Sequence, residues 1–148
     1  MKNLDDLRTE LTDYIYFHQP QMLIGEERVK TEELIQDRAN AAYEMMQTTE
    51  NVPEAIQDAY TLLYEDLKFS AIDEIKDTLE NSFFDYDIDF EDTNVLISIY
   101  TYLLSLIENY TFDDNYMNDT RYPQFRLDLE DKITNYIQHN GILKKVTF

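Results

Sequence analysis

The sequence predicts an all-α fold, a single-domain bundle of about six helices packed around a central apolar helix at about residues 93–110. The chain of 148 residues has only 2 Gly and 3 Pro, too few to supply the turns that a many-stranded protein needs. Its length is that of one ordinary domain with one core. We therefore expect residues 1–148 to form a single helical domain, with 142–148 as a short C-terminal tail.

The central helix is predicted from Val95–Ile107, a run that is apolar apart from small hydroxyls and Tyr. A helix without a polar face is stable in water only when neighbouring elements cover it on all sides. The run is longer than a strand of about 5–6 residues. It is also shorter than the roughly 20 apolar residues needed to cross a bilayer. We therefore expect a buried helix and no membrane span.

The first half of the chain predicts three amphipathic helices. The first ends near Gln19, because Pro20 disfavours a helical conformation in the residue before it. The second starts at Thr31, whose hydroxyl can cap it, and the third starts near Pro53 after a connector at 48–53. Their inner faces are Leu4, Leu7, Leu11, Tyr14, Ile15 and His18; then Leu34, Ile35, Arg38, Ala39, Ala42, Tyr43 and Met46; then Ile56, Ala59, Tyr60, Leu63 and Leu67.

The second half predicts a fourth helix that begins at Ala71 and ends near Phe84, because Ser70 can cap its first turn. Asp85–Asp92 alternates acids with apolar residues as a half-exposed strand would. No partner strand is evident in the sequence, so we expect a loop that leads into the central helix.

The last helix is predicted at about 122–140, after a polar, aromatic-bearing connection at 111–120. Gly141 suits the left-handed conformation that ends many helices. The tail that follows contains the paired bases Lys144 and Lys145.

Charge is the most unusual bulk property of the chain. It has 31 acidic and 12 basic residues, for a net charge of −19, and no Lys or Arg lies between Lys76 and Arg121. Such a field repels phosphate backbones and anionic membranes and attracts basic groups. We expect a basic protein as partner, with no direct nucleic-acid binding and no membrane binding. The alternative is a solvated face that only confers solubility.

The candidate partner-binding residues combine carboxylates with Tyr side chains that can anchor a partner. A helix from about 93 to 110 is about 27 Å long, so the acids before it and the acids after it should form two patches at opposite ends of the bundle. The candidates are Asp85, Tyr86, Asp87 and Asp89 before the helix, and Asp113, Asp114 and Tyr116 after it.

Common catalytic and metal signatures are missing, so we expect no catalytic residues, no cofactor and no metal. The spacing of Asp85, Asp87 and Asp89 imitates a calcium loop, but Phe90 and Leu96 occupy the positions of its Gly and bidentate Glu. The chain has no Cys for zinc or for a thiol nucleophile. Its two isolated glycines cannot form a phosphate-binding loop, and neither histidine belongs to a Glu-x-x-His pair.

Arg38 is a separate candidate, because its spacing places it on the inner face of the second helix. A buried Arg must be paired. We expect either an ion pair with an acid such as Asp66 or Glu74, or hydrogen bonds to carbonyls at a helix end. The alternative is contact with an anion or ligand.

Several local motifs carry a resemblance that covers most of the chain. They are Leu11–Pro20 with its His-Gln-Pro turn, Leu34–Glu44, Leu67–Ser70 and the aromatic pair Phe83–Phe84. This pattern resembles a domain-of-unknown-function family of small acidic helical proteins from anaerobic bacteria, often encoded near mobile elements. The resemblance implies a helical fold and a bacterial interior, and it implies nothing about catalysis.

Two classes of function remain open. The first is a non-enzymatic interaction or adaptor protein that binds a basic partner through acidic, aromatic-bearing loops. The second is an enzyme or small-ligand binder whose site is assembled from scattered carboxylates, Tyr and Arg38. We expect a cytoplasmic protein, because residues 1–20 contain no apolar signal region. The oligomeric state is left open.

Overall fold

The computed structural model describes residues 2–47 and 50–146, and within these ranges it contains helices and one isolated β-bridge but no strand. The predicted all-α class is confirmed. No helix in the described part of the chain combines the length and apolar character needed to cross a membrane. Residues 48–49 of the predicted connector and 147–148 of the predicted tail lie outside the described residues.

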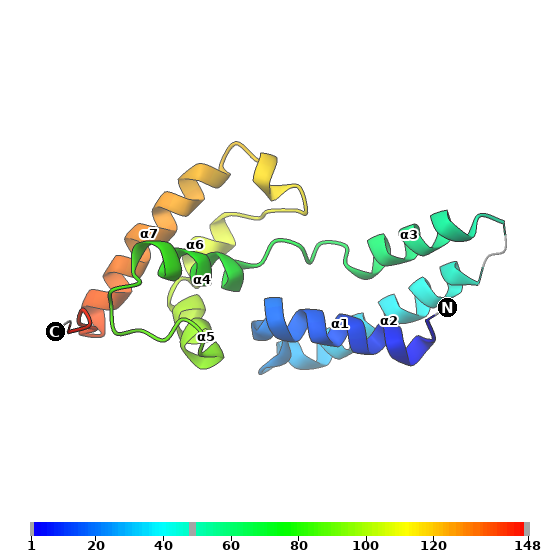
Figure 1. Cartoon of the computed structure of the whole chain (residues 1–148), viewed down its shortest axis with the longest axis horizontal. Helices are drawn as coiled ribbons and strands as arrows, with labels where there is room; N and C mark the ends of the chain where they lie inside the picture. The colour runs from blue at the N-terminus through cyan, green and yellow to red at the C-terminus, as the bar shows by residue number, and fades with distance from the viewer. Residues whose placement is uncertain (1, 48–49, 147–148) are drawn as a thin grey trace. The chain divides into compact units, whose positions relative to one another are not determined.

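The chain divides into two compact units, Met1–Lys68 and Phe69–Phe148, whose helices are labelled in Figure 1. Each unit has its own hydrophobic cluster. The sequence led us to expect one core around 93–110, but that run contributes only to the cluster of the second unit. The apolar faces of the first three helices pack on one another instead. That the whole chain behaves as one domain stays a prediction.

The first unit consists of α1 (Leu4–His18), the short 3-10 helix η1 (Pro20–Leu23), α2 (Glu27–Met46) and α3 (Val52–Leu63). An Asn3 capping box starts α1, and an Asn51 cap starts α3. Ala39, Ala42 and Ala59 are fully buried. These small side chains belong to the hydrophobic cluster of this unit.

The start of α2 differs from the prediction. The helix begins at Glu27, one turn before Thr31, after Gly25 at a φ of +60°. The Thr31 hydroxyl donates to the carbonyl of Met22 at 2.6 Å and to that of Glu27 at 2.9 Å. Its side chain therefore ties α2 to η1 instead of capping the helix.

The second unit consists of α4 (Ala71–Ser82), α5 (Thr93–Tyr102), α6 (Leu104–Asn109), the 3-10 helix η2 (Tyr116–Asn118) and α7 (Tyr122–His139). The Ser70 side chain accepts from the Asp73 amide at 3.0 Å and caps α4. The Asp92 side chain caps α5 by accepting from Asn94 at 2.9 Å. Both caps lie where the sequence predicts a helix start.

The predicted central helix is interrupted at Leu103. This residue is the C-cap of α5 and the N-cap of α6, and its amide donates to the carbonyls of both Ile99 and Tyr100. The run is also not covered on all sides. Leu96, Ile99 and Leu103 are buried at helical spacing, whereas Tyr102 is 44% exposed. The three buried residues pack in the cluster of the second unit. The other side of the run bears hydroxyl groups, including that of Tyr102, which can be hydrated at the surface.

Leu103→Ala should lower the free energy of unfolding by about 2 to 5 kcal/mol, because it removes a fully buried side chain from a packed cluster. The matched control is Leu104→Ala. Leu104 is 36% exposed, so its truncation should cost less than about 1 kcal/mol. Urea denaturation of both variants measures the difference. Equal midpoint shifts would show that Leu103 is not a core residue.

Candidate functional site

The first acidic segment, Asp85–Asp92, lies between α4 and α5 and is anchored by its apolar residues. Ile88 is buried in the cluster of the second unit, and Tyr86 and Phe90 pack against that cluster. Asp87 and Asp89 between them are exposed. The alternation in the sequence thus reflects an anchored backbone with outward carboxylates. It does not reflect a strand of a sheet.

The C-terminal tail is the partner of this segment, a contact that the sequence did not reveal. The Asp87 amide donates to the Leu143 carbonyl at 2.8 Å, and the Lys145 amide donates to the Asp85 carbonyl at 2.6 Å. These two bonds flank an antiparallel bridge between Tyr86 and Lys144. The segment is a loop, as predicted, and the tail adds to it an isolated bridge that the sequence did not reveal.

The second acidic segment, residues 111–120, holds its predicted residues in local turns and ring contacts. Asp113 accepts from the Asn115 amide at 2.9 Å. The Tyr116 ring is half-buried, 5.1 Å from the Phe69 ring and 5.5 Å from the Tyr122 ring. Asp114 is also half-buried.

The two acidic segments lie at opposite ends of the second unit (Figure 1), so the candidate residues of the first segment are not brought together with those of the second. The exposed apolar side chains next to the acids are ones that the sequence reading did not select. Phe84 is 64% exposed, and Met117 is 70% exposed. Their neighbours Tyr86 and Tyr116 are half-buried and pack against other residues of the second unit.

Arg38 on α2 is hydrogen-bonded to backbone carbonyls of the first unit. Its guanidinium donates to the carbonyl of Leu63 at 3.4 Å and to that of Glu65. These carbonyls lie at the C-terminal end of α3, where a cation is favourable for the helix dipole. Among the roles that we considered for Arg38, the structure shows hydrogen bonding to a helix end.

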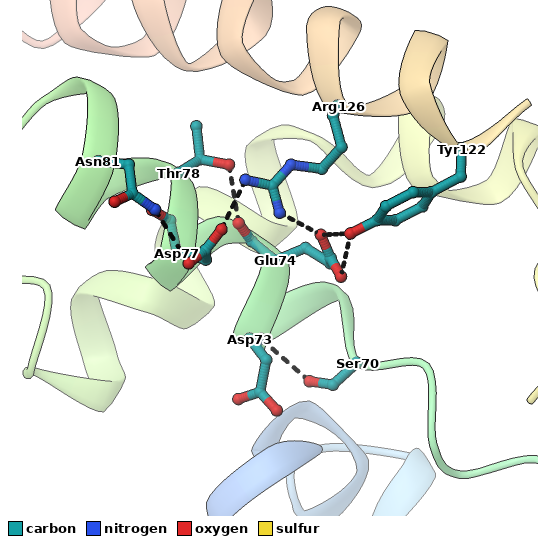
Figure 2. Close-up of polar contacts among 8 residues, drawn as sticks. All are labelled: Ser70, Asp73, Glu74, Asp77, Thr78, Asn81, Tyr122 and Arg126. Carbon is teal, nitrogen blue, oxygen red and sulfur yellow. Dashed lines mark hydrogen bonds and ion pairs between the residues drawn. The ribbon is translucent and has the colours of Figure 1, made fainter. Parts of the chain in front are cut away.

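A buried carboxylate network in the second unit was missed by the sequence reading (Figure 2). Glu74 on α4 is only 7% exposed. The Tyr122 hydroxyl lies 2.9 and 2.7 Å from its two carboxylate oxygens. Arg126 donates from Nη1 to Glu74 at 2.5 Å and from Nη2 to Asp77 at 2.7 Å. The network joins α4 to α7 through charged hydrogen bonds.

This network serves as a structural clamp. A buried carboxylate is costly unless its oxygens are hydrogen-bonded and its charge is paired, and Glu74 has both kinds of partner. Two sequence signals were available. Glu74 stands on the inner face of α4 beside Ile75, and Tyr122 and Arg126 are four residues apart on α7. From the sequence, we named Glu74 only as a possible partner for Arg38.

The Tyr122 phenol makes the clamp sensitive to alkaline pH. Burial, together with the hydrogen bond to Glu74, raises the pKa of Tyr122 from 10.0 to about 12. Because the folded pKa is the higher one, the phenol contributes stability that is present below pH 10 and lost as the pH rises through 12. A difference of about 2 in pKa corresponds to about 2.7 kcal/mol, which solvent screening of a half-buried ring reduces to about 1–2 kcal/mol.

We expect Tyr122→Phe to be less stable than wild type at pH 8 and to approach wild-type stability near pH 12. Chemical denaturation at pH 8, 10 and 11.5 measures the gap. Tyr16→Phe is the control, because Tyr16 is 59% exposed. A gap that stays constant over this range would mean that ionisation of Tyr122 is not coupled to folding.

The first unit has a groove of about 420 Å³. If the protein were an enzyme or a small-ligand binder, this groove would be a candidate for its site. Its polar lining includes Arg8, Arg28, Glu32 and Gln36. Arg28 pairs with Glu32 at 3.1 Å, and Arg8 donates to Gln36 at 2.9 Å. The groove does not bring together two carboxylates for acid–base chemistry. Among the described residues, no group of three or more His, Asp or Glu side chains could hold a metal ion.

Comparison with known proteins shows the family. The model of the family described as Domain of unknown function (DUF1896) matches residues 1–142, and the chain belongs to this family. The chain is also similar in structure to protein PG0816 from Porphyromonas gingivalis. The TM-score is 0.77, the sequence identity is 22%, and the match covers 97% of this chain and 95% of that one. This similarity shows a shared fold. No curated protein matches the chain.

Proposed function

We propose that this DUF1896 protein is a non-enzymatic interaction or adaptor protein that binds a basic protein partner through its acidic segments. The supporting observation is the form of Asp85–Asp92. Its apolar residues pack in the cluster of the second unit. This packing restrains the backbone that carries the exposed Asp87 and Asp89. A preorganised surface loses little conformational entropy on binding.

The charge distribution supports a steering role for this surface. No Lys or Arg occurs between residues 76 and 121, and the net charge of the chain is −19. Complementary charge accelerates encounter with a basic protein, and salt weakens this effect. Exposed Phe84 next to the acids provides apolar area for the contact.

The test is a kinetic comparison with a partner isolated from the native host. Asp87→Asn combined with Asp89→Asn should lower the association rate about three- to tenfold at low salt and change the dissociation rate less. Surface plasmon resonance at low and high ionic strength measures both rates.

The matched control is Glu33→Gln combined with Asp37→Asn, which removes the same charge from exposed positions of α2. This control should associate nearly as fast as wild type. If association is independent of salt, or if both double variants behave alike, the acidic segment acts only as a solubilising surface.

We further propose that the protein acts in the cytoplasm of an anaerobic bacterium and is encoded near mobile elements, as its resemblance to small acidic proteins of that kind suggests. The absence of Cys from the chain is in keeping with a reducing interior. Fractionation of the native host tests the location, and recovery in an extracellular or membrane fraction would contradict it.

A further inference from the structure

We infer that the C-terminal segment Gly141–Val146 is an internal pseudo-ligand of the acidic segment, and that the partner binds as an extended, lysine-bearing peptide segment that takes its place. This inference rests on the proposed function and specifies it. The docking edge is the backbone of Asp85–Asp87, and the occupant is a basic peptide segment.

The tail already makes the contacts that a basic partner would need. Lys144 pairs with Asp85 at 3.6 Å, and its Nζ lies 5.7 Å from the centre of the Tyr86 ring. Two backbone hydrogen bonds flank this residue pair, Asp87 to Leu143 and Lys145 to Asp85. A carboxylate, an aromatic face and a short backbone edge thus bind one lysine-bearing segment. Peptides recognised through their backbone use the same kinds of contact.

The end of α7 directs the tail onto this edge. The Gly141 amide donates to the Gln138 carbonyl at 3.2 Å, and the Ile142 amide donates to the Ile137 carbonyl at 3.0 Å. Together with the φ of +63° at Gly141, these bonds form the Schellman turn that reverses the chain. Ile142 then packs against the cluster of the second unit. The tail beyond it starts from a fixed position.

The same contacts are weak enough to exchange. Leu143 is 75% exposed and Val146 is 76% exposed, so the docked tail buries little apolar surface. The Lys144 side chain is 66% exposed in its ion pair, and such surface pairs contribute little to stability. The tail stays in place because it is covalently attached to α7. A tethered ligand has an effective concentration in the mM range, which compensates for weak contacts.

A tethered competitor would select among partners. A single basic peptide must compete with the tail for one edge. If the tail is docked in about 90% of molecules, the apparent affinity of that peptide is about tenfold lower than its intrinsic affinity. A partner with further basic residues would also contact Asp87 and Asp89, which the tail leaves exposed, and would displace the tail.

The experiment uses the full chain and a fluorescent peptide with the sequence of residues 141–146, Gly-Ile-Leu-Lys-Lys-Val. Lys145→Pro removes the amide that donates to Asp85 and should release the tail. Lys144→Glu should release it by repulsion from Asp85. We expect both variants to bind the peptide about tenfold more tightly than wild type in fluorescence polarisation. Val146→Pro, which lies beyond the bridge, is the matched control and should bind as wild type does.

Amide exchange in wild type provides a second, direct readout. On addition of peptide, the Asp87 amide should stay protected, because it donates to the peptide in place of Leu143. The Lys145 amide of the tail should lose its protection. Unchanged circular dichroism would establish that the variants keep their helices.

The outcomes separate this inference from the proposed function. If wild type and the tail variants bind the peptide equally and Asp87→Asn with Asp89→Asn weakens all of them, the acidic segment binds basic peptides and the pseudo-ligand role is overturned. If no variant binds the peptide, the pseudo-ligand role is also overturned. The proposed function is then judged by the association rates of the isolated partner alone.

Discussion

Replacing Arg126 by Met should lower the free energy of unfolding by about 3 to 5 kcal/mol, because it leaves the Glu74 carboxylate buried without a countercharge. Glu74 is 7% exposed, and Arg126 is its charged hydrogen-bond partner in the clamp shown in Figure 2. Tyr122 can still donate to the carboxylate, but a neutral donor does not compensate the charge. Thermal and urea denaturation at pH 7 measure the loss.

Two controls make this result specific to the buried pair. Arg28→Met removes an exposed Arg that pairs with Glu32 and should cost less than about 1 kcal/mol. Glu74→Gln added to Arg126→Met should restore part of the stability, because an amide carbonyl can accept from Tyr122 without a charge. If the double variant were no more stable than Arg126→Met, lost packing of the long Arg side chain would explain the effect.

Phe125→Ala should cost about 3 to 5 kcal/mol by opening a cavity in the second unit. Phe125 is fully buried. Its ring centre lies 5.2 Å from that of Tyr110 and 5.3 Å from that of Phe112, both near edge-to-face. The loss therefore combines buried area with aromatic contacts.

Leu127→Ala on the same helix is the comparison for Phe125→Ala. Leu127 is 59% exposed, and its truncation should change stability by about 0.5 kcal/mol or less. Urea denaturation followed by circular dichroism gives both values. Similar losses for the two variants would contradict the placement of Phe125 in the hydrophobic cluster of the second unit.

Features that depend on interactions between residues close in sequence were predicted correctly, and features that depend on distant residues were not. The cap at Ser70, the start of a helix after Asp92 and the terminating Gly141 were predicted correctly, because each depends on backbone groups a few residues away. The start of α2 was missed, because the Thr31 hydroxyl also binds Met22 in the preceding element. A residue that can cap a helix can equally hold two elements together.

In the candidate site, too, local features were predicted and contacts with residues distant in sequence were not. The segment Asp85–Asp92 was predicted to be a loop, and its candidate residues Asp87 and Asp89 are exposed. That Tyr86 pairs with Lys144 could not be read from the sequence. An isolated bridge of this kind has no hydrophobic period of its own.

The sequence by itself determined the helical class, most helix ends and the acidic character of the segments around α5 and α6, because these depend on composition and on local spacing. Only the tertiary structure decided that the apolar faces form two clusters and that the helix predicted at 93–110 breaks at Leu103. It also decided that Glu74 pairs with Arg126 and that the tail lies against Asp85–Asp87. These features depend on contacts between residues distant in sequence, where several pairings satisfy the same local pattern and the packed structure selects one.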